Sequence, residues 1–193
     1  MIKFDITKDD AFKVGNTPTL EQVLVHRENR VRYIESLAKQ YHDSVIVSYK
    51  CNIPGSIKNN EVIAYIFSAG KEDLLDCMTR NYWSAVFEKE VNVNTGIEYF
   101  AVLSGIDAVT VKQAMIEIES QNGLARLYDF DVFFVEGKQL KSVTRQVLNI
   151  EPRKCFLCEQ DAKLCGRSRT HGVEELHEKM IELLIERGVC FNG

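Results

Sequence analysis

Three cysteines and a histidine lie close together near the end of the chain, in the stretch RKCFLCEQDAKLCGRSRTH. Cys155, Cys158, Cys165 and His171 have the spacing C-x2-C-x6-C-x5-H, and thiolates and imidazole are the ligands of tetrahedral zinc. On one continuous helix, Cys165 and His171 would be poorly placed to share an ion, so a zinc site requires a break near Gly166. Reduced, buried thiols with the histidine capping a helix are the alternative, and the sequence leaves both open. A redox role is less favoured, because no strand leads directly into the C-x2-C pair.

The same stretch is rich in cationic side chains. Arg167, Arg169 and His171 form a basic cluster that, together with Arg153 and Lys154, could grip a polyphosphate. A solvated basic surface is the alternative interpretation.

Two carboxylates, Asp129 and Asp131, lie in the apolar stretch RLYDFDVFFV. Residues two apart on a strand point to the same face, and two unpaired carboxylates are costly to bury. Magnesium relieves that cost, because it takes oxygen ligands and leaves positions for phosphate oxygens. The pair therefore predicts a magnesium site for phosphoryl or nucleotidyl transfer. Ion pairs to Arg126 or Lys138, or a solvent-facing strand, are the alternatives.

The loop NIPGSIKN (52–59) has the composition of a phosphate-binding turn between a strand and a helix. Backbone N–H groups and the positive end of the helix dipole would face the anion, and Lys58 would add a charge beside Gly55. An ordinary turn is the alternative, since the P-loop pattern is absent.

Hydrophobic periodicity indicates which elements position these residues. A helix is expected over 17–41, with Thr17 or Thr19 as its cap, the cations Arg27, Arg30 and Arg32, and an apolar stripe of Leu20, Val23, Leu24, Val31, Ile34 and Leu37. Strands are expected over 44–49, 83–91, 95–104 and 126–135, and helices from 59 or 60 to 78, from 107 onward and over 174–187. His26, His42 and His177 have no obvious partner and are expected at the surface.

The central order of elements is therefore β-α-β-β-α-β. This order predicts an α+β fold of the ferredoxin-like type, an antiparallel sheet with two helices on one face. The N-terminal helix and a C-terminal Cys/His helical segment are additions. We expect a single domain over 1–193, with its core at about 44–136 and the C-terminal segment at 151–190.

Length and composition fit one soluble domain. The chain has 193 residues and a formal net charge of −4, so nucleic acid is not an expected partner. No apolar run is long enough to span a membrane, and the first residues lack the apolar region of a signal peptide. We therefore expect a cytoplasmic protein with reduced thiols.

An ordered series of motifs resembles the citrate lyase holo-acyl-carrier synthases, the apo-citrate lyase phosphoribosyl-dephospho-CoA transferases. The series is LVHRENR with Arg27 and Arg30, PGSIKNNEV with Pro54, Gly55 and Lys58, NTGIEYF with Gly96 and Glu98, RLYDFDV, and the block with Cys155, Cys158, Cys165, Arg167 and His171. It covers most of the chain after the first fifteen or so residues. Asn122–Ala125 stand where the family usually has His-Pro-Leu-Gly, and Ser56 replaces a common proline.

The resemblance implies a specific reaction. The family moves the phosphoribosyl-dephospho-CoA group from 2'-(5''-triphosphoribosyl)-3'-dephospho-CoA to a serine of the citrate lyase acyl carrier (gamma) subunit, and pyrophosphate leaves. Asp129 and Asp131 would hold magnesium, while Arg126, Lys58 and the loop around Gly55, with Arg27, Arg30, Arg167, Arg169 and His171, would bind the donor. The sequence does not identify the general base, for which a metal-bound aspartate and Glu98 are the candidates.

Two other classes compete with this interpretation. Folate-pathway pyrophosphokinases also carry D-x-D on a ferredoxin-like core, so another nucleotidyl- or pyrophosphoryl-transferase is an alternative. A zinc-containing binding module is the other, with the Cys/His block as its only support.

Overall fold

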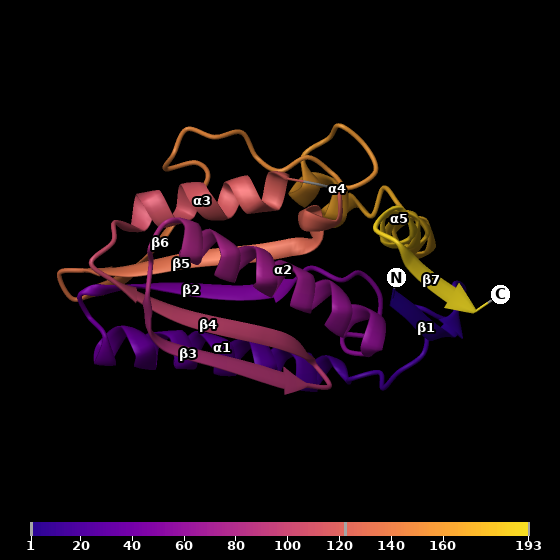
Figure 1. Cartoon of the computed structure of the whole chain (residues 1–193), viewed down its shortest axis with the longest axis horizontal. Coiled ribbons are helices and arrows are strands. Elements are labelled where there is room, and N and C mark those ends of the chain that lie inside the picture. The colour runs from indigo at the N-terminus through magenta and orange to yellow at the C-terminus, as the bar shows by residue number, and fades with distance from the viewer. Residues whose placement is uncertain (1, 122, 193) are drawn as a thin grey trace.

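The computed structural model describes residues 2–121 and 123–192, so Asn122 and the two terminal positions of the expected domain lie outside it. The chain forms a mixed α+β fold, as the sequence predicts. Its main sheet has five antiparallel strands in the order β3-β4-β2-β5-β6 (Figure 1). These strands are β2 (Ser44–Cys51), β3 (Ala85–Val93), β4 (Gly96–Ser104), β5 (Tyr128–Glu136) and β6 (Gln139–Val143).

One face of this sheet carries most of the hydrophobic core. Helices α2 (Glu61–Arg80) and α3 (Ala108–Ser120) pack there on the alternate side chains of the strands, such as Tyr49 and Phe130. Both helices begin where a side chain satisfies a free backbone N–H. Asn60 accepts from Ile63 N at 2.9 Å and Asp107 from Thr110 N at 2.8 Å.

Helix α1 (Leu20–Gln40) covers part of the opposite face. Thr19 caps it in a capping box with Gln22, one of the two caps that the sequence allowed. The expected apolar stripe is only partly correct. Ile34 and Leu37 are buried, but Leu20, Leu24 and Val31 are exposed, because only the C-terminal half of the helix packs on the apolar part of the sheet.

The remaining elements lie around one end of the sheet. They are β1 (Ile2–Thr7), the 3-10 helix η1 (Leu124–Leu127), α4 (Ala162–Ser168), α5 (Val173–Glu186) and β7 (Val189–Asn192). Strands β1 and β7 pair in parallel, with Ile2 opposite Val189, so the two ends of the chain lie side by side (Figure 1). The sequence did not predict β1, β6 or β7, whereas α4 lies within the Cys/His helical segment that it did predict.

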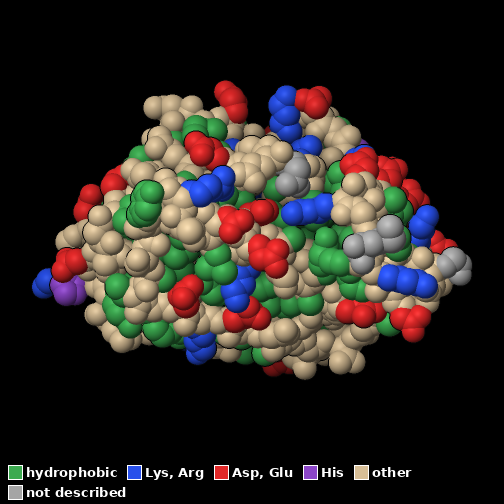
Figure 2. Space-filling model, in the orientation of Figure 1, with side chains coloured by type: hydrophobic (Ala, Val, Ile, Leu, Met, Phe, Trp, Pro, Cys, Tyr) green, Lys and Arg blue, Asp and Glu red, His purple; other side chains and the backbone are tan. Residues whose placement is uncertain are grey.

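The surface over α2 and α3 mixes acidic and basic side chains with apolar ones between them (Figure 2). None of the helices in the described ranges combines the length and the apolar character needed to cross a membrane.

Candidate functional site

The sheet face under α1 is divided into an apolar half and a charged half. Strand alternation places Ile46, Phe100 and Phe133 on this face, where they pack with the C-terminal half of α1. Further along the same strands the residues on this face are charged. Lys50 lies opposite Glu98 on β4 and opposite Asp129 on β5, so three strands present one charged row.

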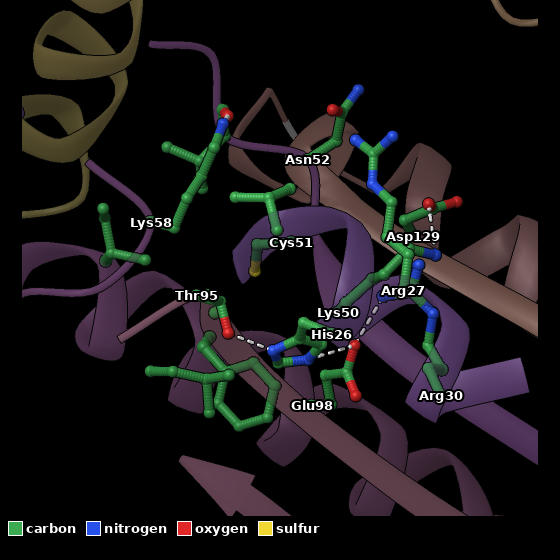
Figure 3. Close-up of a pocket in the computed structure, with 16 residues that line it drawn as sticks. His26, Arg27, Arg30, Lys50, Cys51, Asn52, Lys58, Thr95, Glu98 and Asp129 are labelled. Atoms are coloured by element: carbon green, nitrogen blue, oxygen red, sulfur yellow. Dashed lines mark hydrogen bonds and ion pairs between the residues drawn. The ribbon is translucent and has the colours of Figure 1, made fainter. Parts of the chain in front are cut away.

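A cavity of about 350 Å³ lies over this charged row (Figure 3). Helix α1, the end of β2, the starts of β4 and β5, the loop before α2 and the first turns of α2 form its walls. Among the described residues that line it, four carry a positive charge and two a carboxylate: Arg27, Arg30, Lys50 and Lys58, against Glu98 and Asp129. A protein with a formal net charge of −4 therefore contains a local site suited to an anion.

Lys50 bridges the two aspartates of β5. Its Nζ lies 2.7 Å from Asp129 Oδ2 and 2.8 Å from Asp131 Oδ2. Although burial favours the neutral forms, the attraction between these groups raises the pKa of Lys50 and lowers the pKa of Asp129. The two carboxylates thus share a face, as the sequence predicts, and they share it with a cation from the neighbouring strand.

A second charged cluster centres on Glu98, which is 4 % exposed. His26 Nε2 lies 2.9 Å from Glu98 Oε1, and Arg30 donates to the same oxygen. Burial works against ionisation here, but the contacts with His26 and Arg30 outweigh it and lower the pKa of Glu98. The carboxylate is therefore ionised and fixes both α1 side chains at the cavity wall.

Arg27 and Lys58 leave positive charge unneutralised in the cavity. Arg27 forms no hydrogen bond or ion pair with another described residue, and Lys58 donates only to the Ile53 carbonyl, at 2.7 Å. Burial, and then repulsion from Arg27, lowers the pKa of Lys58. Two cations held near each other without an anion between them form a site that binds phosphate oxygens well.

The structure gathers only part of the predicted site. Arg27, Arg30, Lys58 and Asp129 line the cavity, and Asp131 joins them through Lys50. Within the described chain, the following predicted residues lie outside its wall: Gly55, Arg126, Arg167, Arg169 and His171.

Gly55 and Arg126 have contacts of a structural kind. Gly55 has φ +89°, and a Cβ there would meet the His177 ring at 3.0 Å. Arg126 lies in η1 rather than on the strand, where it donates to the carbonyls of Lys154 and Cys155 instead of contacting an aspartate. It thereby ties the Cys/His segment to the start of β5.

The four predicted metal ligands lie together. The Sγ atoms of Cys155, Cys158 and Cys165 and one ring nitrogen of His171 lie within 4.8 Å of one another, so the group could hold a metal ion. Leu157 N donates to Cys155 Sγ at 3.5 Å, and His171 Nε2 is buried without a hydrogen-bond partner in the described structure. The helix breaks at Arg169, in the left-handed conformation with φ 50°, and not near Gly166 as the sequence suggested.

The sequence interpretation missed Lys50 as a residue of the cavity and wrongly placed His26 and His177 at the surface. Lys50 ends a β-branched strand and gave no signal by itself. His26 was expected at the surface, but its side chain is only 12 % exposed; its spacing of four from Arg30 was an available sign that both share a helix face. His177 is buried, stacks on Phe12 and contacts the Pro54 carbonyl, whereas His42 is exposed as expected.

Comparison with known proteins places the chain among transferases. The chain belongs to the family described as "Apo-citrate lyase phosphoribosyl-dephospho-CoA transferase", whose sequence model matches residues 18–187. A probable apo-citrate lyase phosphoribosyl-dephospho-CoA transferase of Vibrio cholerae is 34% identical over 172 residues, which cover 89% of this chain and 94% of the relative. One from Streptococcus pyogenes, also named probable, is 30% identical over 175 residues, which cover 91% and 90%. Protein CitXG of Haemophilus influenzae is 34% identical over 169 residues, 88% of this chain but only 35% of that protein.

Proposed function

We propose that this protein transfers the phosphoribosyl-dephospho-CoA group from 2'-(5''-triphosphoribosyl)-3'-dephospho-CoA to a serine of the acyl carrier (gamma) subunit of apo-citrate lyase. Pyrophosphate leaves, which makes the reaction of the nucleotidyltransferase type. The observation that carries the proposal is the cavity in which four cations lie beside the Asp129–Lys50–Asp131 group, in a chain that belongs to this transferase family.

The cations of the cavity fit the donor's triphosphate. Arg27 and Lys58 line the cavity without a carboxylate partner among the described residues, so they are in place to neutralise phosphate oxygens. Arg30 is held by Glu98 and supplies a fixed donor near the same wall. Catalysis would then come mainly from positioning the donor and from stabilising the charge on the leaving pyrophosphate.

Asp129 and Asp131 are the residues proposed to hold magnesium. Their side chains are 37% and 46% exposed, and Lys50 contacts only Oδ2 of each carboxylate, so the other carboxylate oxygens could take a cation that arrives with the donor. When bound, magnesium would neutralise part of the triphosphate charge.

The Cys155, Cys158, Cys165 and His171 group is proposed to hold a structural zinc ion. Three thiols and an imidazole form a closed set of four soft ligands, and the buried, unpaired His171 Nε2 needs a partner. The N–H of Leu157 would stabilise the bound thiolate of Cys155. Arg167 and Arg169 are exposed on the same segment and do not line the cavity, so they are proposed as surface cations instead.

We further propose a single domain built on the ferredoxin-like plan. The strand order β3-β4-β2-β5, with α2 and α3 on one face, supports this plan, and α1 and the Cys/His segment are additions to it. The zinc-containing segment would then serve the stability of the transferase and not a separate binding function.

The test is the intact mass of apo acyl carrier subunit after incubation with this protein, the donor and magnesium. The expected result is a gain equal to the donor minus pyrophosphate. Asp129→Asn and Asp131→Asn should each slow the gain at least about 100-fold, whereas Asp43→Asn, exposed just before the opposite end of β2, should not. A wild-type protein that modifies no carrier but binds ATP tightly would support a pyrophosphoryl-transferase instead. Transfer that both variants retain would leave the function and remove the aspartates from the site.

A further inference from the structure

A second cavity, of about 490 Å³, adjoins the first. It lies between α1 and the β3–β4 edge, and its wall is largely apolar, with Val25, Val91, Val93 and Phe100 among its residues. The two cavities share four residues: His26, Arg30, Thr95 and Glu98. Such an arrangement suits a reaction with two substrates, because the reacting atoms could meet where the two cavities join.

His26 stands in this common wall between Glu98 and Thr95. Glu98 is ionised and can only accept hydrogen bonds, so Nε2 of His26, 2.9 Å from Glu98 Oε1, is the nitrogen that donates to it. In a neutral imidazole the lone pair then lies on Nδ1, the nitrogen that contacts the hydroxyl of Thr95 (Figure 3). The structure therefore already pairs Nδ1 with an alcohol, while the buried carboxylate of Glu98 holds the imidazole in place.

We propose that the acceptor serine enters through the second cavity and that His26 Nδ1 takes the proton from its hydroxyl. This inference rests on the proposed function. The serine oxygen forms a bond to the α-phosphorus of the triphosphoribosyl group, and the bond from that phosphorus to the pyrophosphate oxygen breaks. Pyrophosphate leaves with the electron pair. The proton stays on the imidazole, whose positive charge Glu98 stabilises, and passes to solvent after transfer.

The other carboxylates of the site are less suited to this role. Glu98 is 4 % exposed and is occupied by His26 and Arg30, so it positions the imidazole and does not meet the acceptor. Asp129 and Asp131 both face Lys50 and lie outside the second cavity. Thr95, in the turn between β3 and β4, fills the place at Nδ1 that the acceptor hydroxyl would take.

The first experiment measures carrier modification by His26→Ala with and without added imidazole, and donor binding by calorimetry. The expected result is a rate loss of about 100-fold or more, partial recovery with imidazole, and unchanged donor affinity. His26→Gln, which can still donate to Glu98, should be equally slow and should not recover. His42→Ala, exposed at the far end of α1, should match the wild type.

Each other outcome overturns part of the reasoning. Normal transfer by His26→Gln, while the wild type is active, removes the base and leaves the proposed function intact. If His26→Ala no longer binds the donor and its activity is not restored by added imidazole, His26 has a structural role. A wild-type protein that transfers nothing to a verified carrier removes the function and the inference together.

A second experiment tests the entry route. Val93 is 41 % exposed in the second cavity, so Val93→Asp should raise the KM for the carrier about tenfold and leave the donor's affinity unchanged. Val86→Asp, on the same strand outside that cavity and 52 % exposed, is the matched control. A rise in the donor's dissociation constant instead would assign this cavity to the nucleoside or pantetheine part of the donor and overturn the route.

Discussion

Lys50 and Asp129 face each other across the pairing of β2 with β5, with Nζ 2.7 Å from Oδ2. The same ammonium also contacts the carboxylate of Asp131, with Nζ 2.8 Å from Oδ2. A single lysine therefore separates two carboxylates that would otherwise repel each other.

The stability contributed by this group should depend on pH. The folded-state pKa of Asp129 is lowered, so its contribution is present above the unfolded value of about 3.9 and is lost as pH falls through the folded value. Lys50→Met should be less stable than wild type at pH 7, because two carboxylates then face each other alone. The difference should shrink at an acidic pH below the lowered pKa of Asp129, because protonation of that carboxyl removes its attraction to Lys50. Urea unfolding at the two pH values measures it, and a difference independent of pH would contradict the ion-pair assignment.

Donor binding should be linked to proton uptake by Lys58. Its pKa is lowered in the free protein by burial and by Arg27, and a bound triphosphate would raise it again. Affinity for the donor should therefore fall as pH rises from the lowered value to the restored one. Lys58→Met should bind the donor more weakly and should lose the part of the pH dependence that comes from Lys58. The titration of the donor's own phosphates affects both proteins equally and so does not contribute to the difference. Lys39→Met, exposed in the last turn of α1, serves as the control. Calorimetry in two buffers of different ionisation enthalpy measures the number of protons taken up when the donor binds.

Removal of the proposed zinc ion should destabilise the fold. A ligand present at a hundredfold excess over its dissociation constant adds about 2.7 kcal/mol, and for a chain of this size each kcal/mol corresponds to about 2–4 °C in Tm. Cys165→Ser, or a strong chelator, should therefore lower Tm by at least about 5 °C and release the metal. Cys190→Ser, in β7 outside the cluster, should retain it. Elemental analysis that finds no zinc in the wild-type protein would contradict the zinc assignment and support the alternative of reduced, buried thiols.

Gly55→Ala should destabilise the protein more than Gly137→Ala. Both glycines have positive φ, +89° and +63°, so each alanine costs about 1–2 kcal/mol of backbone strain. Only at Gly55 does the new Cβ meet neighbours, the ring of His177 at 3.0 Å and Val173 at 3.3 Å, whereas nothing lies within 4 Å of it at Gly137. The difference in Tm between the two variants measures the effect of that contact. Equal losses of Tm would show that the loop adjusts freely around His177.

The sequence predicted the central strands and helices well, because their periodicity is local and their caps, Asn60 and Asp107, are typical. It did not predict the short strands β1 and β7, whose pairing joins the two ends of the chain. Nor could it orient α1. The helix has apolar residues along its length, and only the position of Phe100 and Ile46 on the sheet decides that Ile34 and Leu37 are the buried ones.

The candidate site was predictable where the residues act in pairs close in sequence. Asp129 and Asp131 are two apart on one strand, and the Cys/His ligands lie within one short segment. Lys50 was not predictable, because its partners lie about eighty residues away and depend on which strands pair. Arg126 was placed on the wrong element, since the chain turns through η1 before β5 begins.

Helix α1 is anchored unevenly, and this has a consequence for its motion. All its buried residues, Ile34, Leu37 and Ala38, lie in the C-terminal half, while the N-terminal half is held mainly by the contacts of His26 and Arg30 with Glu98. Amides of the first three turns should therefore exchange with deuterium well before those near Leu37. A ligand that bridges Arg27 and Lys58 should slow the early exchange, so the helix that forms the cavity wall would gain its rigidity from what the cavity binds.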